Sequence, residues 1–142
     1  RAYPMPFTVH DEAEGLWVTL TGFAVPYEFQ EVALATAAHP DRDRHRYHLF
    51  DFSDIDRDAL FALTEAIGAS HAAKSREIFG DRENPKFTGL ISPHEKMQTV
   101  FRAFIDSNPR PPGHVIRRFT TLMQARAWLR ECLNGEHPEN AG

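Results

Sequence analysis

The chain has little of what would tie it to an oxidising compartment or to a membrane. It contains one cysteine, Cys132, which cannot form an internal disulfide. It also lacks an apolar run of about 18 residues, the length needed to span a bilayer, and an apolar N-terminal segment of the kind that directs secretion. We therefore expect a cytoplasmic protein with no stable membrane insertion.

The sequence also lacks an excess of charge of one sign. Its 16 basic and 20 acidic residues give a net charge of -4 and occur in mixed runs such as PDRDRHR, so no basic field attracts phosphates. Neither a G-x-G-x-x-G loop nor a Walker loop occurs. Nucleic acid is therefore not an expected partner, and we expect no cofactor.

What the chain does have is enough apolar bulk for one globular domain. Of its 142 residues 42% are hydrophobic, and 11 are phenylalanine. A domain of this size buries roughly 68–70% of the surface that its unfolded chain exposes, which is sufficient for a core without disulfides or metal. We expect one domain over residues 5–133 and a disordered tail over residues 134–142.

Hydrophobic periodicity predicts the first half of the domain. Two short β-prone runs, residues 7–10 and 16–21, flank a turn and predict an antiparallel hairpin. Helical spacing from Pro26 to the His39-Pro40 stop predicts a first helix. Residues 47–52, if extended, carry apolar side chains on both faces of the strand, which predicts a central strand covered on both sides.

The second half continues the alternation of helices and strands. We predict a helix over residues 58–78 closed by Gly80, a strand over 86–91, a helix after Pro93, a strand over 114–119 and a last helix begun by a Thr121/Gln124 capping box. Strands joined by helices of this length are parallel, with right-handed crossovers. The expected fold is therefore α/β, with a single mixed five-stranded sheet in the order ββαβαβαβα.

Three short motifs carry a family resemblance. The sequence DFS closes the predicted central strand at 51–53, VIRRF forms the last strand at 115–119, and ARAWL lies in the last helix at 125–129. In this order the chain resembles the STAS-like group, the fold of sulfate transporters and anti-sigma-factor antagonists, in the bacterial branch grouped with CRAL-TRIO lipid-binding domains. The resemblance spans nearly the whole chain and implies a regulatory module rather than an enzyme.

The family's phosphorylation switch is missing from this sequence. Anti-sigma-factor antagonists have an Asp-Ser-Ser-Gly turn after the strand, whose serine is phosphorylated. Here Arg57-Asp58-Ala59 stands where Ser-Ser-Gly would be, and Ser53 matches the strand end rather than the switch. We therefore expect no serine phosphoswitch.

Polar residues follow two strands of the predicted sheet at the point where each strand ends. In open α/β sheets this edge is where binding residues usually lie. The expected interaction edge consists of Ser53, Asp54, Asp56, Asp58, Ser92 and His94. Our first functional hypothesis is a non-catalytic module that binds a protein partner, or a second copy of itself as a homodimer, through this edge.

The acidic turn also has the spacing of a calcium loop. Asp54, Asp56, Asp58 and Glu65 occupy positions 1, 3, 5 and 12 of such a loop. However, Ala59 stands in place of the glycine that makes the sharp bend, and a helix beginning there draws Glu65 away. We expect Asp54 or Asp56 to cap the helix, with no metal bound, and a metal-dependent enzyme remains a remote alternative.

Other candidate catalytic sets are incomplete. No glycine-flanked nucleophile turn supports a Ser/His/Asp triad, and Cys132 has the helical spacing of a packed residue. His45 and His48 are three residues apart, which on a strand predicts opposite faces and no shared ion. We therefore expect no catalytic residues.

A second hypothesis comes from the abundant phenylalanine and from the CRAL-TRIO affinity of the group. It is a carrier or sensor of a small apolar or lipid-like ligand, held between the helices and the sheet. An interior without a cavity would exclude it.

Overall fold

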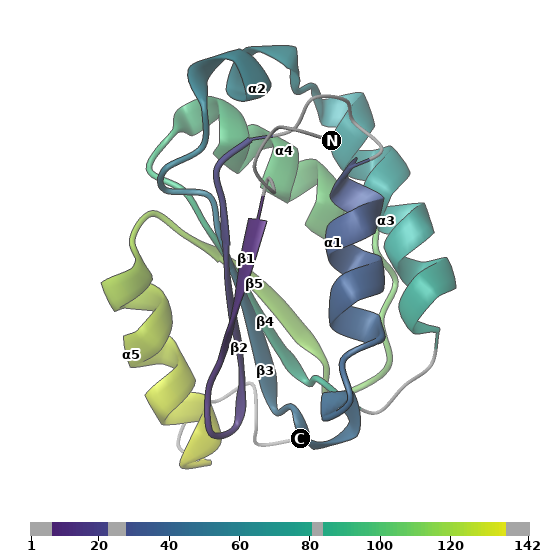
Figure 1. The fold of residues 1–142 in the computed structure, drawn as a ribbon, viewed down its shortest axis with the longest axis vertical. Helices are drawn as coiled ribbons and strands as arrows, with labels where there is room; N and C mark the ends of the chain where they lie inside the picture. Colours follow the sequence, from purple (N-terminus) through teal and green to yellow (C-terminus); the bar gives the residue numbers. More distant parts are fainter. Residues whose placement is uncertain (1–6, 23–27, 81–83, 136–142) are drawn as a thin grey trace.

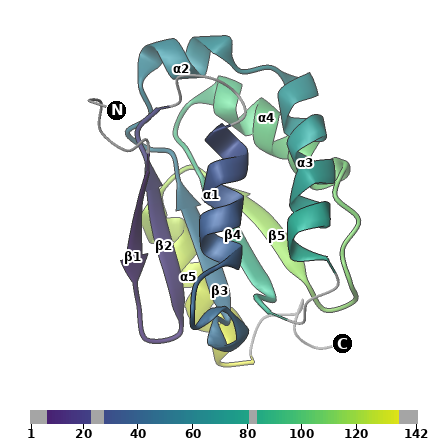
Figure 2. The ribbon, with the colours of Figure 1, turned by 45° about the vertical axis from the view of Figure 1, so that its right-hand side comes forward.

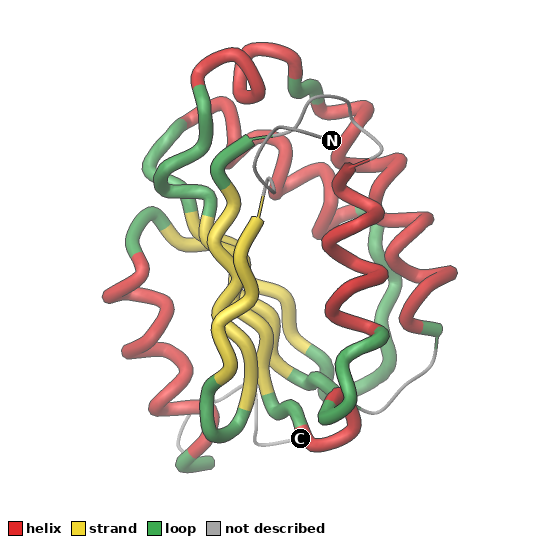
Figure 3. Tube along the Cα trace, in the orientation of Figure 1, coloured by secondary structure: helices red, strands yellow, loops and turns green. Residues whose placement is uncertain are grey.

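A single five-stranded sheet runs through the centre of the molecule (Figures 1 and 3). The computed structural model describes residues 7–22, 28–80 and 84–135. The strands are β1 (Phe7–Asp11), β2 (Gly15–Leu20), β3 (Tyr47–Asp51), β4 (Phe87–Ile91) and β5 (Val115–Phe119), in that order across the sheet. The β1–β2 pair is antiparallel and the other pairs are parallel, which confirms the predicted mixed α/β sheet.

The helices cover the sheet unequally. They are α1 (Glu28–Ala37), α2 (Arg57–Ala62), α3 (Glu65–Phe79), α4 (Glu95–Asp106) and α5 (Leu122–Leu133), with a short 3-10 helix at Arg42–Arg44. Figures 1 and 2 show α1, α3 and α4 on one face and α5 on the other. Right-handed crossovers that step in one direction across a sheet place their helices on the same face, so among the described helices only α5, which follows β5, lies on the opposite face. Among the described helices none is long and apolar enough to cross a membrane.

The central strand divides its side chains between two cores. Leu49 of β3 packs in the core beneath α5. Phe50 packs against the core beneath α1, α3 and α4, together with Leu16 and Val18 of β2. β3 is the third of five strands, which confirms its predicted central position.

Helix α4 has the amphipathic face that its sequence predicts. Met97, Val100 and Phe101 are buried, and Phe104 and Ile105 are partly buried against the same core. The ring of Phe101 lies 5.3 Å from that of Phe52, centroid to centroid, at an angle of 60°.

The predicted helix over residues 58–78 is wrong in one respect, because two helices occupy this segment. α2 ends at Ala62, and Leu63 takes an extended conformation that buries its side chain in the core. Thr64 then begins α3, its Oγ1 accepting a hydrogen bond from Ile67 N at 3.3 Å. Gly80, at φ 61°, ends α3 as predicted.

The capping box before α5 is half formed. Thr121 Oγ1 accepts a hydrogen bond from Gln124 N at 3.2 Å, as predicted. The Gln124 side chain instead accepts from Thr120, from its N at 3.2 Å and its Oγ1 at 2.8 Å. Pro26, at the predicted start of the first helix, and residues 136–142 of the predicted tail lie outside the described residues.

Candidate functional site

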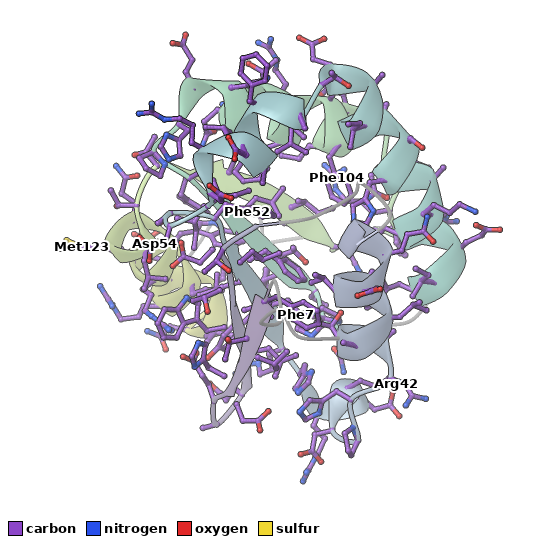
Figure 4. All side chains as sticks on the ribbon, turned by 45° about the horizontal axis from the view of Figure 1, so that its top comes forward. Phe7, Arg42, Phe52, Asp54, Phe104 and Met123 are labelled. Atoms are coloured by element: carbon purple, nitrogen blue, oxygen red, sulfur yellow. The ribbon has the colours of Figure 1, made fainter. Side chains whose placement is uncertain are left out.

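The predicted interaction edge lies at the carboxyl ends of β3 and β4. Phe52 N donates to Ile91 O at 2.8 Å, so the chain leaves the two strands at the same level of the sheet. Ser53 and Asp54 follow β3, and Ser92 and His94 follow β4. Figure 4 shows Asp54 toward the periphery of the molecule and Phe52 nearer its centre.

A buried carboxylate organises the β3 side of this edge. Asp51 accepts hydrogen bonds from Ser53 N at 3.0 Å, from Ser53 Oγ at 2.5 Å and from Trp17 Nε1 at 3.1 Å. These three donors satisfy a carboxylate that is only 7% exposed. The Ser53 hydroxyl therefore stabilises the turn after the strand.

Ser92 has a similar structural role on the β4 side of the predicted interaction edge. Its Oγ accepts a hydrogen bond from His94 N at 3.1 Å, which fixes the turn into α4. Gln98 Nε2 donates to the carbonyl oxygens of Ser92 and Phe119, both at 2.8 Å, and its Oε1 accepts from Arg118 at 3.0 Å. His94 therefore contacts Ser92 through its backbone N–H, and its imidazole takes no part in this hydrogen bond.

The aspartates of the edge are exposed, and Asp56 caps α2. Asp56 Oδ1 accepts a hydrogen bond from Asp58 N at 3.4 Å, which confirms the predicted cap. Glu65 belongs to the next helix, α3. Over the described ranges 7–22, 28–80 and 84–135, no group of three or more His, Cys, Asp or Glu side chains is placed to hold a metal ion.

Two histidines form a buried pair, which corrects the prediction that they point to opposite faces. Nδ1 of His45 lies 3.1 Å from Nε2 of His48, and both residues are buried. His45 precedes β3, so strand alternation does not apply to it. Burial, with a smaller contribution from His45, lowers the pKa of His48 to about 3, and burial also lowers the pKa of His45, so the pair is neutral at pH 7.

An apolar cavity lies between the sheet and the three helices of the larger layer. Its volume is ≈ 160 Å³. Engineered cavities of about 150 Å³ lined by Leu, Ile and Phe stay dry and bind benzene. The strand side chains that line it are Leu20, His48, Phe50, Thr88, Leu90, Val115 and Ile116, and the helical ones include Ile67, His71, Phe79, Met97, Val100, Phe101 and Phe104.

Polar groups are few inside the cavity. His48 comes from the strand side, and His71 comes from α3, where its ring stacks on Phe104 at 5.6 Å between centroids. Burial lowers the pKa of His71 to about 4, so this imidazole is also neutral at pH 7. The interior therefore offers a mostly apolar surface with two neutral imidazole rings and the side chain of Thr88.

The lining also includes residues near the amino ends of the parallel strands. Arg76 lies in the last turn of α3, Lys86 directly precedes β4, and Arg110 lies between α4 and β5. Arg110 Nη1 donates to Ile105 O at 3.2 Å and to Asn108 O at 2.9 Å.

Sequence reasoning did not locate the cavity residues. They come from four strands and three helices, and no short motif joins them. Two residues in the sequence could have indicated the cavity: His48 and Thr88 are polar residues at strand positions that face the core. A third was Gly68 of α3, where a Cβ would lie 2.5 Å from Val100 O of α4.

Comparison of the chain with protein-family models, with curated proteins and with solved structures finds no match. The interpretation of the site therefore depends on its geometry and chemistry.

Proposed function

We propose that this protein is a non-catalytic binding protein that holds a small apolar ligand in the cavity between the sheet and helices α1, α3 and α4. The observation that carries the proposal is an apolar cavity of ≈ 160 Å³ between the sheet and these three helices. Its size suits a phenyl ring or a short alkyl chain. Burying six carbons at about 0.8 kcal/mol each gives about 5 kcal/mol, a dissociation constant of about 0.2 mM before specific contacts.

The polar residues near the sheet edge support binding rather than catalysis. The hydroxyl groups of Ser53 and Ser92 take part in the turns after β3 and β4. We also propose membership of the STAS-like group, supported by the strand and helix order, and a relation to lipid-binding CRAL-TRIO domains agrees with a carrier or sensor.

A titration with toluene, a neutral apolar probe, tests this function. Toluene added to the protein should shift the NMR signals of methyl groups that line the cavity, such as those of Leu90, Met97 and Ile116, in a saturable way. The variant Thr88→Phe places a ring in the cavity from β4. It should weaken toluene binding at least about tenfold, because the probe then competes with a covalently attached ring.

The matched control is Thr8→Phe, the same substitution at an exposed position of β1. It should bind toluene like the wild type. Signals that do not saturate, or equal binding by the wild type and Thr88→Phe, would contradict a ligand site in the cavity.

A second candidate function, contact with another protein, is favoured by exposed apolar side chains near the predicted edge. Phe61 of α2 is 82% exposed and Met123 of α5 is 81% exposed. Lys96 Nζ lies 5.0 Å from the centroid of the Phe61 ring. We propose that a second copy of the chain covers this edge, with the carboxylates of Asp54 and Asp58 at its margin.

Light scattering over a range of protein concentrations tests this candidate. A dimer should form with increasing concentration, and Phe61→Ser should weaken it at least about tenfold, since large apolar residues dominate most interfaces. Leu34→Ser, which removes another exposed apolar side chain from α1, is the control and should leave the dimer unchanged. A monomer at every concentration would rule out self-association.

A further inference from the structure

We infer that the ligand of the cavity carries a hydroxyl group on its apolar body, as a phenol does, and that this hydroxyl hydrogen-bonds to His48 and Thr88. The inference rests on the proposed function and adds the chemical class of the ligand. It depends on two polar side chains that lie side by side on the sheet and line the cavity.

His48 and Thr88 are neighbours on adjacent strands. The register pairs His48 of β3 with Thr88 of β4, so their side chains leave the sheet on the same face, and neighbouring strands lie only about 4.8 Å apart. The same row of the sheet continues with Leu16 on β2 and with Ile116 on β5. Two polar residues therefore interrupt a row that is apolar at both ends, where the row lines the cavity.

Each of these two side chains has a hydrogen-bonding atom that a ligand can use. Nε2 of His48 is paired with Nδ1 of His45 at 3.1 Å, which leaves Nδ1 of His48. In the described part of the chain, no hydrogen bond reaches this nitrogen or Oγ1 of Thr88. His48 is only 2% exposed, so bulk water does not supply a partner for it. A buried polar atom without a partner is costly, and a polar group on the ligand removes that cost.

A hydroxyl group fits this pair better than a charged group does. Burial lowers the pKa of His48 to about 3, so its imidazole is neutral at pH 7 and attracts no ionised group. In a neutral imidazole one nitrogen donates and the other accepts, depending on the tautomer. A hydroxyl both donates and accepts, so it can bond to Nδ1 of His48 in either tautomer and also to the Thr88 hydroxyl beside it.

The next residues along the two strands orient the ligand. Phe50 and Leu90 form the following register pair on this face, and both line the cavity. Residues two apart on a strand are separated by about 6.6 Å, which is comparable to the length of a phenol molecule. The hydroxyl therefore lies at His48 and Thr88, and the ring lies against Phe50 and Leu90.

Phenol and toluene separate these hydrogen bonds from the apolar surface of the cavity, because they have nearly the same shape and differ by a hydroxyl in place of a methyl group. A wholly apolar cavity binds phenol more weakly than toluene, since the hydroxyl loses its bonds to water. We expect calorimetry to show phenol binding at least as tightly as toluene. Phenol should also shift the nitrogen NMR signal of His48 Nδ1 more than toluene does.

The variant Thr88→Val removes the hydroxyl of Thr88 at nearly constant shape. It should weaken phenol binding about tenfold and leave toluene binding unchanged, because only phenol loses a hydrogen bond. Thr8→Val makes the same substitution at an exposed position of β1 and is the matched control. It should bind both probes like the wild type.

The possible results separate this inference from the proposed function. Tighter binding of toluene than of phenol by the wild type would overturn the hydroxyl ligand and leave an apolar site. An equal effect of Thr88→Val on the two probes would overturn the hydrogen bond to Thr88, and an Nδ1 signal unchanged by bound phenol would overturn the one to His48. Failure of both probes to bind would contradict the proposed function itself.

Discussion

At the scale of single residues, the least expected feature is the neutral imidazole pair. The predicted opposite orientation of His45 and His48 was wrong because the strand begins at Tyr47, after His45. The two rings meet at 3.1 Å, where one nitrogen donates and the other accepts. Protonation of either ring places a charge in a buried site, so the pair makes stability depend on pH.

We predict that the protein loses stability as the pH falls from 7 to 5. Burial lowers the pKa of His48 from 6.5 to about 3. Below pH 6.5 the unfolded chain therefore binds a proton that the folded chain does not, and the stability present above this pH declines. His48 alone should account for about 2 kcal/mol of the free energy of unfolding between pH 7 and pH 5.

Urea denaturation of the wild type and of His48→Gln at both pH values measures this contribution. The variant should lose about 2 kcal/mol less than the wild type on acidification. His94→Gln, which removes a histidine outside the cavity, is the matched substitution with which His48→Gln is compared. Equal losses in the wild type and His48→Gln would show that His48 is not held neutral.

At the scale of elements, periodicity and capping predicted most of the fold. Apolar side chains on both faces of residues 47–52 located the central strand, and the apolar spacing from Met97 to Ile105 located α4. The break between α2 and α3 was missed because neither glycine nor proline marks it. Burial of Leu63 in the core favours the break, and Thr64 followed by Glu65 was the local signal of a new helix start.

The close packing of α3 on α4 predicts that Gly68→Ala lowers stability, whereas this substitution usually raises the stability of a helix. Gly68→Ala in a helix usually stabilises, because alanine has the higher helix propensity by about 1 kcal/mol. Here the new Cβ would lie 2.5 Å from Val100 O, a backbone atom that moves only with α4. We expect Gly68→Ala to destabilise the protein by about 1–3 kcal/mol.

Thermal or urea denaturation checks this sign. Ser70→Ala, at an exposed position of the same helix, should change the free energy of unfolding by less than about 0.5 kcal/mol. A more stable Gly68→Ala protein would mean that α3 and α4 are farther apart than described.

At the scale of the whole molecule, the two faces of the sheet differ in how they are held. On the α5 face, Arg126 donates to both oxygens of Glu12, at 3.0 Å and 2.6 Å, and Tyr47 Oη donates to Glu12 at 2.6 Å. Burial, and then the hydrogen bond to Glu12, raise the pKa of Tyr47 to about 12. These bonds tie the hairpin, β3 and α5 together, whereas the opposite layer contains the cavity.

Some residues of the candidate site could be predicted from the sequence, and others could not. The positions of Ser53 and Ser92 at the polar edge could be predicted because each follows the end of a strand, and the role of the edge in binding stays a prediction. A cavity depends on the gap left between side chains that are distant in the sequence, such as Phe50 and Phe104, and no local pattern records that gap. The resemblance to STAS-like proteins stays a prediction.

A crystal structure of the protein equilibrated with toluene, solved beside one of the Thr88→Phe variant, shows directly whether the cavity holds an apolar ligand. We expect a toluene ring enclosed by Phe50, Leu90 and Phe104 in the wild type, and no toluene in the variant, whose introduced phenyl ring fills the same space. A wild-type interior closed by its own side chains, or toluene bound only at the surface, would show that the cavity is not a ligand site.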